Sequence, residues 1–280
     1  MPDVRPFRAL RYESEIVGNL AAVVSPPYDL VDPAAAAELL ASHPKNAVRL
    51  DVPGDEQGDG PDDQYRRAAR TFAAWRSDGT LRKDPKPSLY VYEQASGDTI
   101  KRGFFGRLRL EPLLPDAGVL SDDRGPAPAR DDRYKLLRAT GVNTSPIVGT
   151  YADPTGDAAR ILAATARTNP IIDLVDGGGT HHRMWSLAAE GPDAEQVARL
   201  VAIVGGGPLT LVDGRRRYDA GLRYRDERRM SRSCEEDPAF DYILTLFLEA
   251  PPAPSAEAAG SATPSLPRPL TGLLINPHEW

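Results

Sequence analysis

The chain has 280 residues, of which 41% are hydrophobic and 26% are charged, and its formal net charge is −6. This composition predicts an ordinary globular protein and excludes collagen-like and largely disordered chains. No run approaches the roughly 18 apolar residues that a membrane span requires. The first residues, MPDVRPFRALRY, also lack the apolar core of a signal peptide. We therefore expect a cytoplasmic protein without a membrane partner.

Cysteine and histidine are scarce, which limits the metal and disulfide chemistry that the chain can support. Cys234 is the single cysteine and cannot form an internal disulfide. No zinc-ligand spacing can be drawn with it and the four histidines. The acidic net charge argues against a nucleic-acid partner, because phosphate-driven binding needs clustered lysine and arginine.

The first half of the sequence predicts a mixture of helices and strands. We expect a short strand at 20–25, a helix that Asp32 caps and that runs to Ala41, a helix at 64–79, and a hairpin of strands 89–94 and 99–110. The helix at 64–79 is the clearest of these. Its apolar side chains recur at three- and four-residue spacing, as a buried stripe requires: Tyr65, Ala69, Phe72 and Trp75.

The second half continues the same mixture. We expect helices near 131–139, 156–167, 192–203 and 215–232, strands near 146–151 and 209–212, and a hairpin of 171–176 with 181–187. The apolar run 239–249 fits a buried strand or a buried helix equally well. Hairpins interspersed with helices indicate an α+β fold, with mixed sheets and surrounding helices, and not a doubly wound parallel sheet.

Composition also predicts the domain organisation. Residues 1–250 read as a single α+β domain of one or two lobes. Residues 251–269 are rich in proline, alanine and serine and read as a linker. The tail, 270–280, regains large apolar side chains, so we expect it to dock on the domain, with Leu273, Leu274 and Ile275 buried.

The strongest candidate site is the turn at 211–218. A short strand passes through Asp213-Gly214 directly into a helix that begins with Arg215, Arg216 and Arg217, followed by Tyr218. Unpaired N–H groups and three guanidinium groups would meet at the positive end of the helix dipole, which favours phosphate binding. The alternative is a solvated corner whose arginines pair with neighbouring acids.

Three weaker candidates remain. Asp122 and Asp123 lie in a long loop where functional carboxylates are often displayed, although carboxylates that only aid solubility are commoner there. Tyr28 and Asp29 follow two prolines and could contact a substrate or cap the next helix. His181 and His182 are adjacent on a predicted strand, so they point to opposite faces, and a structural role fits them better than a shared site.

Several of these segments together resemble a known bacterial family. The resemblance covers residues 4–249 and is to the domain of unknown function family 1015, which itself resembles the ParB/sulfiredoxin-like superfamily. The segments that carry it, in chain order, are Arg5-Pro6-Phe7, VSPPYD (24–29), Asn46–Leu50, YVYEQ (90–94), DDRYKLLRATGVNTSPI (131–147), His182–Trp185 and VDGRRRY (212–218).

The superfamily includes free serine kinases and nucleotide-binding domains, in which phosphates sit on a Gly-x-x-Arg turn at a helix N-terminus. That turn matches Gly214–Arg217 here. The family usually has two histidines where this chain has Arg215 and Arg216, and a His-Glu pair where this chain has Asp122 and Asp123. The resemblance therefore implies phosphate binding by residues 213–218, with Asp123 as the base and Asp122 beside it.

The resemblance and the arginine-rich turn lead to one principal expectation. We expect a kinase-like enzyme that transfers a phosphoryl group from a nucleotide to the hydroxyl of free serine or a related small metabolite. The expected nucleotide is ATP, with ADP or CTP as alternatives. Mg²⁺ is the expected cofactor, and Tyr28 and Asp29 are the expected substrate contacts. The alternative is a non-catalytic nucleotide-binding module that acts through protein interaction.

Overall fold

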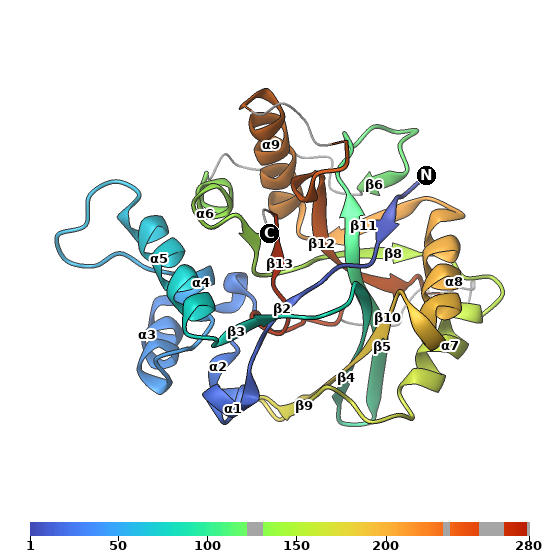
Figure 1. Cartoon of the computed structure of the whole chain (residues 1–280), viewed down its shortest axis with the longest axis horizontal. Coiled ribbons are helices and arrows are strands. Elements are labelled where there is room, and N and C mark those ends of the chain that lie inside the picture. Colours follow the sequence, from blue (N-terminus) through green and yellow to red (C-terminus); the bar gives the residue numbers. More distant parts are fainter. Residues whose placement is uncertain (122–130, 232–235, 252–265, 279–280) are drawn as a thin grey trace, which may run out of the picture.

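The computed structural model describes residues 1–121, 131–231, 236–251 and 266–278. It is an α+β protein built on a large mixed sheet (Figure 1). The path of the sheet is β6-β11-β8-β12-β5-β4-β10-β9, and β1 pairs with β5 off this path. None of the described helices is long and apolar enough to cross a membrane.

Strands from both halves of the chain form this sheet. The bounds are β1 Val4–Arg5, β4 Ser88–Ser96, β5 Thr99–Arg109, β6 Val119–Ser121, β8 Ile147–Tyr151, β9 Ile172–Val175, β10 His181–Ala188, β11 Leu209–Asp213 and β12 Tyr242–Glu249. Most neighbours are antiparallel, whereas β12 with β8 and β11 with β6 are parallel. Two small sheets flank it: β2 Leu10–Tyr12 with β3 Leu81–Lys83, and β7 Val142–Asn143 with β13 Asn276–Pro277.

Helices surround the sheet (Figure 1). They are α1 Ser14–Val17, α2 Leu20–Val23, α3 Pro33–Ser42, α4 Val48–Asp51, α5 Asp63–Ser77, α6 Asp132–Thr140, α7 Asp157–Thr165, α8 Ala194–Gly205 and α9 Arg215–Ser231. Short 3-10 turns are η1 Tyr28–Leu30, η2 Gly191–Asp193 and η3 Ala239–Asp241. The predicted helices α3 and α5 and the two hairpins β4–β5 and β9–β10 are confirmed.

Strand β12 explains why the apolar run 239–249 had no readable period. Ile243 and Phe247 point into the core cluster that α7 and α8 cover, whereas Leu244 and Leu246 point into the cluster on the other face of the sheet. A strand buried on both faces loses the alternation that marks a half-exposed strand.

The predicted strand at 20–25 is wrong for its first four residues. Leu20–Val23 forms the helical turn α2, and the side chain of Asn19 accepts a hydrogen bond from the N–H of Ala21. Asparagine is a strong N-cap residue, and this local bond favours a helical turn over a strand. Only Ser25 makes a β-bridge, and its partner is Thr271 in the C-terminal tail.

The tail packs against the domain. Leu270, Leu273 and Leu274 are buried in the cluster on the second face of the sheet, and Ile275 joins the cluster formed by α5, β2 and β3. These side chains therefore help to close the core. Residues 252–265, most of the predicted linker, lie outside the described residues.

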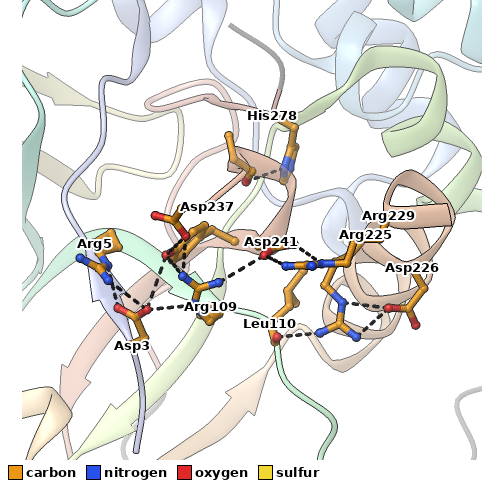
Figure 2. Close-up of polar contacts among 12 residues, drawn as sticks. Asp3, Arg5, Arg109, Leu110, Arg225, Asp226, Arg229, Asp237, Asp241 and His278 are labelled. Atoms are coloured by element: carbon orange, nitrogen blue, oxygen red, sulfur yellow. Dashed lines mark hydrogen bonds and ion pairs between the residues drawn. The ribbon is translucent and has the colours of Figure 1, made fainter. Parts of the chain in front are cut away.

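A polar network ties the N-terminal strand to α9 and η3 (Figure 2). The carboxylate of Asp241 is almost fully buried and forms ion pairs with Arg109 on β5 and Arg229 on α9. A carboxylate buried in this way is tolerated because charged partners replace the water that it loses.

Candidate functional site

The turn between β11 and α9 lies at the edge of two neighbouring cavities. One, of about 290 Å³, is lined by Tyr28, Asp29, Ser121 and the turn residues 211–217. The other, of about 440 Å³, contains Tyr28 and Arg216 again and reaches the α6 residues Asp132 and Arg133. Because the two cavities share Tyr28 and Arg216, we call them together the hollow. Residues from several separate segments of the sequence line it.

Gly214 is required at this turn for two reasons. Its φ of +91° lies in the region that other residues rarely adopt. A Cβ at this position would also lie 2.8 Å from Cγ2 of Ile147 on the neighbouring strand β8. The turn therefore lets α9 begin immediately after β11. The first-turn N–H groups, which have no partner within the helix, belong to residues 215–217, which line the 290 Å³ cavity.

The three arginines of the turn differ in their partners. Arg215 pairs with Asp219 one helical turn later, and Arg217 pairs with Asp213. The Nε of Arg217 is buried and has no hydrogen-bond partner. Arg216 lines both cavities, and among the described residues it makes no ion pair. Arg216 is therefore the cation of the turn most available to a ligand.

The ring of Tyr28 contacts two guanidinium groups. The centroid of its ring is 4.2 Å from Cζ of Arg133 and 5.4 Å from Cζ of Arg217. Both distances fall within the range of cation–π interactions. The ring thus brings together an arginine from α6 and one from α9.

Arg133 forms an ion pair with the buried carboxylate of Asp51. Its Nη1 donates to Oδ1 of Asp51 at 3.1 Å, and its Nη2 donates to Asp132 at 2.7 Å. Burial opposes the charge on Arg133, but these two carboxylates outweigh that effect, so the pKa of the guanidinium is raised. Arg133 therefore stays charged and oriented.

Three hydroxyl groups complete the hydrogen bonding of Asp51. The donors are Thr144 to Oδ1 at 2.7 Å, and Ser145 and Thr271 to Oδ2 at 2.8 and 3.2 Å. A small cavity of about 30 Å³ lies among Asp51, Arg133, Asn143 and Arg217. This polar cluster is connected to the 440 Å³ cavity through Arg133, which lines both.

The structure brings most of the sequence-predicted residues together. Tyr28, Asp29 and residues 213–217 line the same cavity, although Asp29 also pairs with Arg268 of the tail. Tyr218 does not line it: its side chain is fully buried, and its hydroxyl donates to the carbonyl of Glu111 at 2.8 Å. Tyr218 thus anchors α9 to the core.

Asp122 and Asp123 lie outside the described residues. Ser121, the last described residue before them, lines the 290 Å³ cavity. It is placed there because β6 runs parallel to β11, with Ser121 opposite Leu211. The chain therefore leaves β6 at the edge of the hollow.

Asp51, Arg133 and Thr271 are members of the site that sequence reasoning missed. Arg133 belongs to a segment that carries the family resemblance, but the sequence pattern around it did not mark it as a binding residue. Asp51 directly follows another such segment, Asn46–Leu50, and that position was the available signal. Thr271 is 220 residues away from Asp51 in the chain, so no local pattern could link them.

Histidines 181 and 182 occupy opposite faces of β10, as predicted. His182 is buried between Tyr92, whose hydroxyl lies 2.7 Å from Nδ1, and Asp176, whose Oδ2 lies 3.1 Å from Nε2. His181 is partly exposed and contacts Asp173. Neither histidine lines the cavities at the turn.

A family model described as Protein of unknown function (DUF1015) matches residues 4–252. The chain belongs to this family. Searches of curated proteins and of solved structures returned no match. Three of the segments that carry the family resemblance, 24–29, 131–147 and 212–218, line the hollow described above.

Proposed function

We propose that the hollow at the β11–α9 turn binds the phosphates of a nucleotide, and that the chain is a phosphotransferase acting on the hydroxyl of free serine or a related small metabolite. The observation that carries the proposal is the meeting of a helix N-terminus with Arg216 and with the two arginines that contact the Tyr28 ring, Arg133 and Arg217. Main-chain N–H groups and guanidinium forks are both good phosphate donors.

The charges of the 290 Å³ cavity support an anionic ligand. Three arginines line it, against the carboxylates of Asp29 and Asp213. The charge of Asp29 is already balanced by Arg268, which is not part of the lining. Arg216 thus remains as an uncompensated cation that a phosphate could neutralise.

Phosphoryl transfer depends mainly on positioning and charge neutralisation, which an arginine-bearing turn can supply. With ATP as donor, the acceptor oxygen would bond to the terminal phosphorus as its proton passes to Asp123. The bond from that phosphorus to the diphosphate oxygen would then break. Asp122 would lie beside this base, and Tyr28 and Asp29 would contact the acceptor.

The residues present can be compared with what Mg²⁺ needs. Among the described residues, no group of three or more His, Cys, Asp or Glu side chains could hold a metal ion. Mg²⁺ commonly binds through substrate phosphates and one or two carboxylates, and Asp131 and Asp132 line the larger cavity. Such an ion would neutralise charge on the nucleotide, whether ATP, ADP or CTP. We further propose a ParB/sulfiredoxin-like core and a cytoplasmic reaction.

One observation favours the alternative, a nucleotide-binding module without catalysis. Each described carboxylate in the two cavities is already in an ion pair: Asp29 with Arg268, Asp131 with Arg223, Asp132 with Arg133 and Asp213 with Arg217. Each of these carboxylates therefore already faces an arginine of the chain. Catalysis therefore depends on Asp123, and without it the site would bind only.

The binding step is tested by calorimetric titration of ATP, ADP and CTP with Mg²⁺. We expect Arg216→Ala to weaken affinity for the best nucleotide about tenfold or more, because one charge-assisted contact is lost. Arg199→Ala is the matched control, since Arg199 lies on α8 and pairs with Asp157. Equal affinity of the Arg216→Ala variant and the wild-type chain would refute the site.

The catalytic step is tested with Asp123→Asn. We expect phosphorylation of serine to be lost while nucleotide affinity stays within a few fold, because a base acts on the acceptor and not on the donor phosphates. If the wild-type chain binds nucleotide but phosphorylates none of a panel of hydroxyl metabolites, the non-catalytic module is the correct function.

A further inference from the structure

A second cationic cavity, of about 190 Å³, lies where the N-terminal segment, β5 and the tail meet. Its charged lining residues are Arg8, Lys83 and Arg107, and none of the described residues that line it is acidic. Phe7 and Pro277 contribute apolar walls. The cavity is thus a cationic hollow without an acidic residue in its described lining.

Arg107 is the unusual member of this group, as a comparison with Arg109 shows. The two are two residues apart on β5, so their side chains lie on the same face of the strand. Both lie over the ring of Tyr242, with Cζ 5.0 Å and 4.6 Å from its centroid. Arg109 also has three carboxylate partners, Asp3, Asp237 and Asp241 (Figure 2).

Arg107 makes no ion pair with any residue that the structure describes, and its Nε is buried without a hydrogen-bond partner. Burial lowers the pKa of Arg107, although Tyr242 and Asp237 oppose this. Burial also lowers the pKa of Lys83, and the cations Arg8 and Arg107 add to the effect. A buried polar atom without a partner is costly, so an anion that accepts a hydrogen bond from Nε of Arg107 would stabilise the fold.

We propose that this cavity binds a phosphate group, carried by inorganic phosphate or by a small phosphate monoester. A dianionic phosphate would place negative charge beside Arg107, and a guanidinium group matches its oxygen atoms in geometry. The apolar walls leave room for the small body of an ester. Asn276 also lines the cavity, and its Nδ2 donates at 3.1 Å to Asn143, which lines the small cavity at Asp51.

The test is calorimetric titration of the full chain with inorganic phosphate and with glycerol 3-phosphate, in chloride buffer of matched ionic strength. We expect Arg107→Met and Lys83→Gln each to raise the Kd of the bound probe about tenfold or more, because each removes a charged donor. Two variants are used so that a folding defect in one of them, checked by circular dichroism, does not decide the result.

Two controls separate this cavity from general charge effects and from the β11–α9 turn. Arg82→Gln removes a neighbouring exposed cation that pairs with Glu13, and Arg216→Gln removes the available cation of the turn. Arg82→Gln should leave the Kd within about twofold, and the binding that remains in Arg216→Gln is the binding at this cavity. The proposal is wrong if neither probe binds the wild-type chain, if both cavity variants bind as the wild type does, or if binding is lost in Arg216→Gln alone.

Discussion

The guanidinium of Arg133 and the carboxylate of Asp51 form a buried ion pair, with Nη1 3.1 Å from Oδ1, beneath the ring of Tyr28. The pair joins α6 to α4 across 82 residues of sequence. It also connects the core to the hollow, because the same guanidinium that Asp51 holds is the one that stacks on Tyr28. Stability and site geometry therefore depend on one carboxylate.

We predict that Asp51→Asn lowers the free energy of unfolding by about 3–5 kcal/mol, because the change removes the buried one of the two carboxylates that pair with Arg133. Urea denaturation measures the loss. Ser145→Ala, which removes one of the hydroxyl donors to Asp51, should cost only about 1–3 kcal/mol. A loss below about 1 kcal/mol for Asp51→Asn would show that the pair contributes little.

We predict that Gly214→Ala destabilises the chain by about 1–3 kcal/mol, because alanine is strained at a positive φ and its Cβ would collide with Ile147. Gly177→Ala serves as the control. Gly177 has an ordinary φ, and the space that an alanine methyl group would occupy there is open, so its replacement should change stability by less than about 0.5 kcal/mol. Equal stabilities of the two variants would contradict the argument.

We predict that His182 titrates below its ordinary pKa of 6.5, because burial disfavours its charged form more strongly than Asp176 favours it. The unfolded chain then binds a proton near pH 6.5 while the folded chain does not. Stability should therefore fall as the pH drops from 6.5 toward the folded pKa. NMR titration of the His182 ring measures this, and a midpoint at or above 6.5 would overturn the prediction.

The tail offers a test of packing. Leu274 is buried, with 3% of its surface exposed, so Leu274→Ala should cost about 2–5 kcal/mol through lost burial and the cavity that remains. Leu266, at 40% exposed, begins the same described segment, and Leu266→Ala should stay within about 0.5 kcal/mol. Thermal unfolding of both variants makes the comparison, and similar melting temperatures would mean that the tail adds no stability.

Local pattern in the sequence determined most of the helices and both hairpins. The three- and four-residue spacing of Tyr65, Phe72 and Trp75 predicted α5, and the cap Asp32 predicted the start of α3. The Asp-Gly corner before three arginines predicted a strand that turns directly into a helix, and β11 and α9 have this form. Such features are readable because the interactions that cause them lie within a few residues.

Features that depend on contacts between distant segments were decided only by the tertiary structure. Strand β12 is buried on both faces, so its sequence shows no alternation. The wrong strand at 20–25 has a local cause instead, because the cap of α2 is the adjacent Asn19. The site depends on contacts between distant segments: Asp51 meets Arg133 and Thr271, and Tyr28 meets Arg217. Arg107 and Arg109 look alike in the sequence, and only packing gives one of them carboxylate partners and places the other in a cavity, because pairing across the fold leaves no local trace.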